Sequence, residues 1–126
     1  MADALVAIHS VLRWVVLAGL VAGGGWALLR APIAPTFRAQ PFALVAAVVD
    51  VQVLLGILLY LVKRGWTQGV FIAAIHPVVM LAALALVHVG LVGARRRHTP
   101  LDAHRAIGAA YLFALAVVAF GVPWYR

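Results

Sequence analysis

The sequence contains no cysteine, and only 10% of its 126 residues are charged. Without cysteine it can form no disulfide, no thiolate metal site and no Cys-ligated iron–sulfur cluster. A soluble domain is about a quarter charged and about half apolar, whereas 67% of this chain is hydrophobic and its mean hydropathy is +1.11. So small a domain cannot bury that much apolar surface in one core. These values exclude a water-soluble enzyme, a nucleic-acid binder and a disordered segment, and they indicate an integral membrane protein.

Acidic residues are also scarce, with three Asp and Glu against ten Lys and Arg. Most of the basic residues lie between hydrophobic runs, where positive charge sets membrane topology, so we do not expect a nucleic-acid partner. The segment 1–7 has no basic residue and therefore lacks the positive start of a signal peptide. We expect the first apolar run to remain as a membrane helix.

Four apolar runs have the length of about 20 residues that a helix needs to cross the hydrocarbon layer. They cover about residues 5–29, 42–62, 70–92 and 104–122. Because the connections are short, consecutive helices must be antiparallel neighbours. The sequence predicts an all-α integral membrane protein, an antiparallel up-down-up-down four-helix bundle that forms a single domain over residues 1–126.

The basic residues are unevenly distributed between the two sides of this bundle. The side that includes the second connection and the chain end carries only three basic residues, Lys63, Arg64 and Arg126. By the positive-inside rule the first and third connections face the cytoplasm and both termini lie outside. These two connections and the residue just beyond them hold six basic residues, Arg30, Arg38, Arg95, Arg96, Arg97 and Arg105.

Histidine is the most frequent ionisable residue in the spans, where such residues are costly and usually face a functional site. His9 and His76 lie at similar depths near the predicted outer side, and His88 and His104 lie near the inner side. Two imidazoles on facing helices can supply both axial ligands of a haem iron. A helix–helix hydrogen-bonding role is the alternative for each of these histidines.

His76 and His88 are 12 residues apart, about 18 Å along a helix and roughly 120° around it. They would have to face different neighbouring helices. This angle favours one haem over two, but the residues alone leave both possibilities, one haem and two haems, open. His76 precedes Pro77, so the third helix either begins there or kinks there.

Other residues support a slot for a flat cofactor. Gln52, Gly56 and Tyr60 form one row on the second helix, and Gly108 shares a face with His104 on the fourth. Glycine on such a face admits a macrocycle close to the backbone, or it serves close helix packing, which is common in membranes.

Two charged residues within the spans also require an explanation. Arg13 lies one turn from His9 on the same face, where a guanidinium can hold a haem propionate or extend to the lipid headgroups. Asp50 lies in the middle of the second span. It could orient a histidine, pair with an arginine or relay protons at a quinone site.

Several short motifs are similar to a group of small bacterial four-helix membrane proteins labelled cytochrome b-like, and more loosely to b561-type di-haem bundles. They are HSVLRW from His9, DVQVLLGILLY from Asp50, HPVVM from His76, HVG from His88, HR from His104 and the closing PW. The resemblance implies b-type haem, with His9 and His76 as one ligand pair and His88 and His104 as the other.

The leading hypothesis is a membrane b-type cytochrome with one or two bis-His haems. It would transfer electrons within or across the bacterial inner membrane, with quinone or as a subunit of a larger redox complex. Whether it is itself an enzyme is open. The alternatives are a cofactor-free assembly or scaffold subunit and a metal or proton transporter that uses the histidines and Asp50.

Overall fold

A computed structural model describes residues 2–124, and these form four long helices without strands. The helices are α1 (Ala2–Arg30), α2 (Gln40–Val62), α3 (His76–Arg95) and α4 (Pro100–Gly121). A short 3₁₀ turn, η1 (Gly65–Thr67), and one π turn, η2 (Phe71–Ile75), connect α2 to α3. Each of α1, α2, α4 and the continuous segment Phe71–Arg95 is long and apolar enough to cross a membrane. The predicted all-α membrane fold is confirmed.

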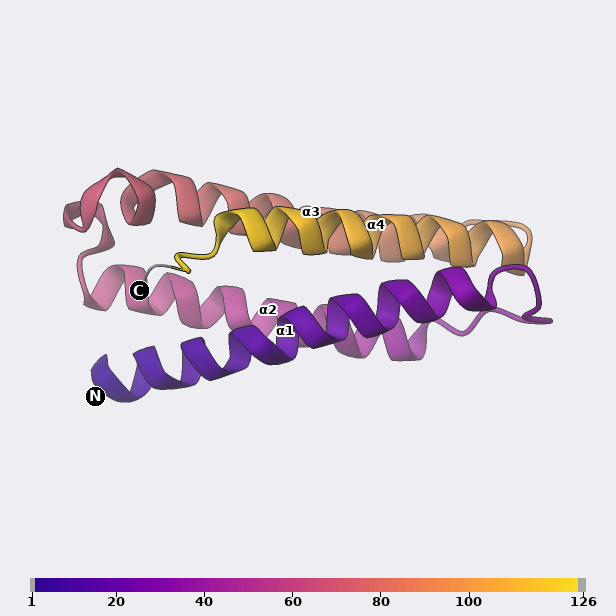
Figure 1. The fold of residues 1–126 in the computed structure, drawn as a ribbon, viewed down its shortest axis with the longest axis horizontal. Helices are drawn as coiled ribbons and strands as arrows, with labels where there is room; N and C mark the ends of the chain where they lie inside the picture. The colour runs from indigo at the N-terminus through magenta and orange to yellow at the C-terminus, as the bar shows by residue number, and fades with distance from the viewer. Residues whose placement is uncertain (1, 125–126) are drawn as a thin grey trace.

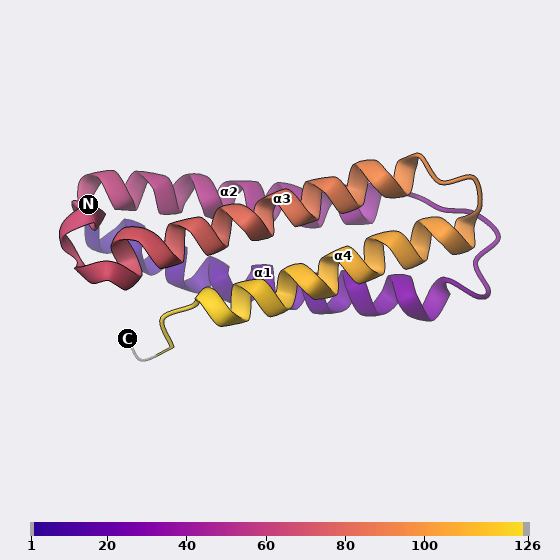
Figure 2. The same ribbon diagram turned by 90° about the horizontal axis from the view of Figure 1, so that it is seen from above.

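The helices run antiparallel in chain order, as Figures 1 and 2 show. Both chain termini and the α2–α3 connection lie at one end of the bundle, which we call the terminal end. The α1–α2 and α3–α4 connections lie at the other, the arginine end, which is named for Arg30, Arg38, Arg95, Arg96 and Arg97. Much of each helix surface is exposed and apolar, as contact with a lipid bilayer requires.

The start of α3 differs from a regular helix for a reason that lies in Pro77. Proline has no N–H, so it cannot donate to the carbonyl of Ala73 four residues earlier. The hydroxyl of Tyr60 on α2 donates to that carbonyl instead, at 2.8 Å. The chain before His76 forms the π turn, and regular α-helix continues from His76 within the same helical segment. Of the two geometries expected for this position, the helix does not begin at His76 but runs through it, with the π turn as a local distortion just before Pro77.

Helix α4 begins at Pro100, four residues before the predicted start. Thr99 caps it, because its hydroxyl oxygen accepts a hydrogen bond from the backbone N–H of Asp102 at 3.1 Å. Pro100 occupies the first turn, where a missing N–H costs nothing. His104 consequently lies one full turn inside the helix rather than at its start.

The best-packed part of the bundle lies between α1, α3 and α4, where glycines allow close approach. A Cβ on Gly108 would come within 2.7 Å of Leu28 and 3.2 Å of the Gly24 carbonyl oxygen. A Cβ on Gly90 would meet the Ala110 side chain. In α1 the buried residues begin only at Val16, so the first half of this helix has no fully buried side chain among those described. Figure 1 shows this half diverging from α4 towards the terminal end.

Candidate functional site

A cavity of about 490 Å³ occupies the terminal half of the bundle, where the first half of α1, the later part of α2, the start of α3 and the end of α4 line it. This volume falls within the range of about 300–1,000 Å³ that is common for ligand pockets. Its wall is mainly apolar. Residues predicted for the outer site and for the cofactor slot meet here, since the lining includes His9, Arg13, Gln52, Gly56, Tyr60 and His76.

His76 is held in one orientation by the end of α4. Its Nδ1 lies 2.7 Å from the carbonyl oxygen of Gly121, the last residue of that helix, whose carbonyls have no helical partner. A carbonyl oxygen only accepts, so Nδ1 carries the hydrogen and donates it. In the neutral imidazole, the Nε2 atom then keeps its lone pair. A backbone carbonyl commonly fixes metal-binding imidazoles in this way.

His9 faces the cavity from α1, and the structure makes room for its ring. A Cβ on Gly56 would lie 3.1 Å from Cε1 of His9, so a larger residue there would press on the imidazole. The Gln52 amide donates a hydrogen bond of 2.8 Å to the His9 carbonyl, which ties α2 to α1 at this level. Nδ1 of His9 is buried and has no hydrogen-bond partner among the described residues.

His9 and His76 lie at neighbouring levels of the bundle. His9 is opposite Gly56, and Tyr60, one turn further along α2, reaches the carbonyl of Ala73 just before His76. One helical turn advances about 5.4 Å. The two imidazoles therefore lie near one another along the bundle and line the same cavity. These are the two residues that the depth estimate from the sequence had paired.

Arg13 lies one turn from His9 on α1, where its guanidinium carbon is 5.2 Å from the Trp14 ring centre and 5.8 Å from that of Trp124. These cation–π contacts hold the arginine at the rim of the cavity. Its Nε is buried without a partner, as is Oε1 of Gln52. Buried polar atoms are almost always paired. In the described part of the chain the three exceptions, His9 Nδ1, Arg13 Nε and Gln52 Oε1, all belong to side chains that line this one cavity.

His88 is bonded to Asp50 rather than facing the cavity. Its Nε2 lies 2.6 Å from Oδ1 of Asp50, which joins α3 to α2. The two side chains are 46% and 42% exposed. Of the roles left open for Asp50, the orientation of a histidine is the one that the structure shows.

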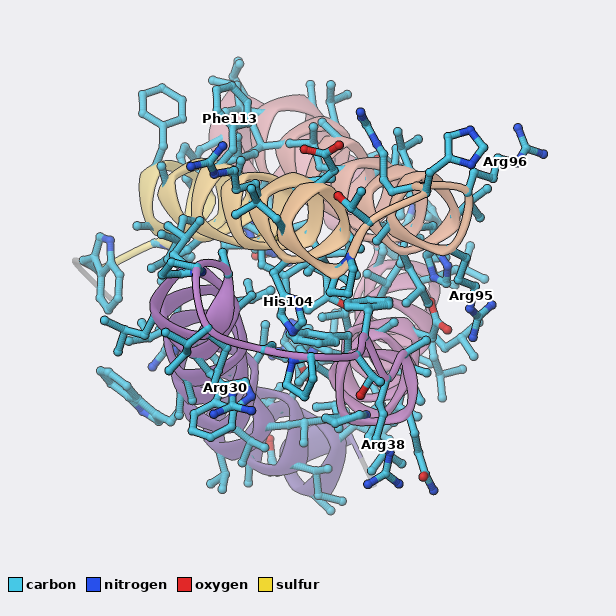
Figure 3. The ribbon with its side chains drawn as sticks, turned by 90° about the vertical axis from the view of Figure 1, so that its right-hand side faces the viewer. Arg30, Arg38, Arg95, Arg96, His104 and Phe113 are labelled. Carbon is cyan, nitrogen blue, oxygen red and sulfur yellow. The ribbon has the colours of Figure 1, made fainter. Side chains whose placement is uncertain are left out.

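His104 lies elsewhere in the bundle, and its side chain points into the interior at the arginine end (Figure 3). The ring is buried, its Nδ1 is 2.7 Å from the carbonyl oxygen of Pro100, and it forms a T-shaped contact with the Phe37 ring. These are the contacts of a histidine that stabilises the packing.

The structure does not bring His88 and His104 together. Gly90 lies against Ala110 and Gly121 against Val79, so residues of α3 and α4 lie at the same level when their numbers sum to 200. His104 is therefore level with residue 96, eight residues or about 12 Å from His88 along the bundle. Two axial ligands must reach one iron, which this stagger does not allow. Gly108 likewise serves the contact between α4 and α1 and does not line the cavity.

The cavity lining also includes three polar residues that were not predicted for the site, namely Ser10, Gln68 and Lys63, which the sequence analysis counted only as a topology charge. A signal for Lys63 was present, because it lies seven residues after Gly56 and so continues the row of Gln52, Gly56 and Tyr60. Gln68 lies beyond η1, in a connection whose path the apolar pattern does not predict.

Comparisons of the chain with protein-family models, curated proteins and solved structures find no match. The chemistry of the site must therefore be argued from its geometry. Among residues 2–124, no three His, Cys, Asp or Glu side chains gather around a point where they could hold a metal ion. Two imidazoles in an apolar cavity suit a metal that arrives with most of its coordination already filled, as in a macrocycle.

Proposed function

We propose that this protein is a membrane b-type cytochrome that binds one haem in the terminal-half cavity and transfers electrons in the membrane. The observation that carries the proposal is the pair of imidazoles, His9 and His76, on the wall of one apolar cavity whose lining side chains have buried polar atoms without partners. Haem would supply one-electron chemistry, and the protein would set its potential through ligation, burial and nearby charge.

Each polar residue of the cavity has a role in this proposal. His76 would ligate through Nε2, since its Nδ1–H is donated to Gly121. His9 would ligate from α1, and Gly56, which has no side chain, would let the His9 imidazole lie against α2 at the wall of the cavity. Arg13 and Lys63 are the cations on the lining, and either can neutralise a propionate.

We propose one haem rather than two, because the contacts of His88 and His104 give each of them another partner. His88 is bonded to Asp50, and His104 is packed against Phe37 about 12 Å away along the axis. The resemblance noted from the sequence motifs supports the cytochrome assignment for the first pair of histidines.

The distribution of charge supports a location and orientation for the protein. Five arginines mark the arginine end, so we propose that this end faces the cytoplasm of a bacterial inner membrane and that both termini lie outside. The haem would then lie nearer the outer surface. A redox partner, or a larger membrane complex, would exchange electrons with it.

The test is a reduced-minus-oxidised visible spectrum of the purified protein from haem-replete cells, with pyridine haemochrome quantitation. We expect a low-spin b-type spectrum at about one haem per chain. His9→Ala and His76→Ala should lose the low-spin signal, whereas the matched control His98→Ala, in the exposed α3–α4 connection, should retain it. Colourless wild-type protein would overturn the proposal in favour of a cofactor-free scaffold subunit. Two haems per chain would show that the second histidine pair also ligates.

A further inference from the structure

A polar pair lies on the outer surface of the bundle, midway along its helices. Asp50 is the eleventh residue of the 23-residue helix α2, and its contact with His88 places both side chains at that depth. The two side chains remain 42% and 46% exposed. Polar groups in the middle of a membrane span are costly unless other polar groups cover them. The pair therefore indicates a neighbour that carries polar groups at the same depth.

The contact between Asp50 and His88 uses one hydrogen-bonding atom of each. Among residues 2–124, Oδ2 of Asp50 and Nδ1 of His88 have no hydrogen-bond partner. Two arrangements of the hydrogens leave the pair without net charge, which costs least in hydrocarbon: a carboxylate with an imidazolium, or a carboxylic acid that donates to a neutral imidazole. In both arrangements Nδ1 carries a hydrogen and Oδ2 accepts one. The pair thus presents a donor and an acceptor side by side.

A donor beside an acceptor is complemented by a second copy of the same pair, turned by half a rotation. In a two-fold symmetric dimer each surface patch meets its own copy. With the symmetry axis along the membrane normal, both copies have the same orientation and the same depth. Nδ1–H of each His88 can then donate to Oδ2 of Asp50 in the other copy. Any other neighbour would need a donor and an acceptor at this depth, whereas a second copy of the chain has them there already.

The residues around the polar pair let a second copy approach closely. Since Asp50 is level with His88, Ala47 lies one turn from the pair towards the arginine end, and Ala85 lies one turn towards the terminal end. Small residues of this kind allow membrane helices to come together. Like charges of two copies would meet only at the helix ends, where salt screens their repulsion. We call this surface the α2–α3 face; it consists of Ala47, Asp50 and Leu54 on α2 and Ala85, His88 and Val92 on α3.

We propose that the protein forms a two-fold symmetric homodimer in the membrane through the α2–α3 face, with each His88 bonded to Asp50 of its own chain and of the other chain. The dimer does not depend on the proposed electron transfer, because neither residue is a ligand of the proposed haem. It would also complete the cavity wall. Ile57 and Leu81 line the cavity two turns from the polar pair on the same helix faces, and they are 47% and 50% exposed. A second copy would separate this part of the cavity from lipid.

The first test is disulfide cross-linking in membranes, since the chain has no cysteine of its own. In the proposed dimer α2 of one copy lies against α3 of the other, with Leu54 at the level of Ala85. Two differently tagged chains, one with Leu54→Cys and the other with Ala85→Cys, are co-expressed and oxidised with copper phenanthroline. The control pairs Leu54→Cys with Phe113→Cys, which is 61% exposed on α4 at nearly the depth of His88. We expect a mixed disulfide dimer from the test pair and none above background from the control.

The second test separates the polar pair from the rest of the α2–α3 face. Asp50→Leu combined with His88→Leu removes both partners together, so neither is left unpaired in the bundle. Dimer affinity is measured by energy transfer between labelled copies in phosphatidylethanolamine–phosphatidylglycerol liposomes at several protein-to-lipid ratios. We expect dimerisation to weaken by about tenfold, as the loss of two hydrogen bonds between membrane helices would cause. The control Phe113→Leu should dimerise as the wild type does.

Haem content and thermal melting are measured on the same samples, so a variant that fails to fold is recognised. Equal cross-linking of the test and control pairs, or wild-type affinity in the doubly substituted leucine variant, would overturn the proposal. A chain that is monomeric in liposomes, and whose α2–α3 face cross-links in cells to a different membrane protein, would overturn it too. A colourless protein that dimerises as expected would contradict only the proposed haem, whereas a monomer that binds haem would contradict only the dimer.

Discussion

The two halves of this bundle use the same residue types for opposite purposes. In the arginine half, His104 has its Nδ1 on the Pro100 carbonyl and its ring against Phe37, and Gly108 lets α4 touch α1. In the terminal half, His9 has a buried nitrogen without a partner among the described residues, and its ring lies against Gly56 on the wall of the cavity. Neither histidine nor glycine in a membrane helix therefore indicates function by itself. What distinguishes the two halves is whether neighbouring protein atoms fill the space and satisfy the polar groups.

The largest expected effect is in the packed half, where Gly108→Leu should prevent the normal contact of α4 with α1. Its Cβ would lie 2.7 Å from Leu28 and 3.2 Å from a backbone oxygen that cannot move independently. Overpacking of this kind costs up to about 3 kcal/mol or more, so we expect the folded bundle to be lost or strongly destabilised. Thermal unfolding followed by circular dichroism in detergent measures the effect.

Gly25→Leu is the matched control, since nothing lies within 4 Å of a Cβ at that position. A helical glycine costs roughly 0.5–1 kcal/mol relative to alanine, so the control should melt at or slightly above the wild-type temperature. Equal melting of the two variants would contradict the assignment of Gly108 to helix packing.

The fold was predictable because hydropathy and length are properties of single segments. Runs of about 20 apolar residues must form helices in lipid, and short connections leave only one topology. The predicted bounds differ from those of α1 and α2 by a few residues. They were less accurate for α4, because a start at Pro100 depends on a cap by Thr99 that lies outside the apolar run.

The site was predictable where depth alone decided it. Counting residues from the helix ends brought His9 and His76 to one level, and Gln52, Gly56 and Arg13 followed from helical spacing. The same count paired His88 with His104, but their distance depends on how α3 slides against α4. That register is set by contacts such as Gly90 with Ala110, which only the packed structure reveals. The bond between Asp50 and His88 likewise depends on the register of α2 against α3.

An intermediate effect is expected in the cavity half, where Gly56→Leu should reduce haem retention while the bundle still folds. The new side chain would press on Cε1 of His9, at 3.1 Å from its Cβ, and would extend into open space. We expect the affinity for haem to fall by about tenfold, which corresponds to a loss of about 1.4 kcal/mol of binding free energy. Haem transfer to an excess of an apo-acceptor protein measures it.

Gly93→Leu, with no atom within 4 Å of its Cβ, is the control for a bulky residue in a helix and should retain haem as the wild type does. If Gly56→Leu keeps its haem while Gly108→Leu unfolds, the packing comparison stands, but the haem does not lie beside Gly56.

The smallest effects separate two tyrosines that each donate a hydrogen bond to a backbone carbonyl. Tyr60 donates to Ala73, whose carbonyl lost its α-helical donor to Pro77, and Tyr111 donates to Phe42 in the packed half. Replacing either by phenylalanine should cost about 1 kcal/mol of stability, the net value of one such bond. Only Tyr60 also holds the turn that precedes His76. Tyr60→Phe should therefore alter the reduced haem spectrum and its midpoint potential, whereas Tyr111→Phe should lower the melting temperature alone. Equal spectral changes in both variants would mean that the two halves are coupled more tightly than their contacts indicate.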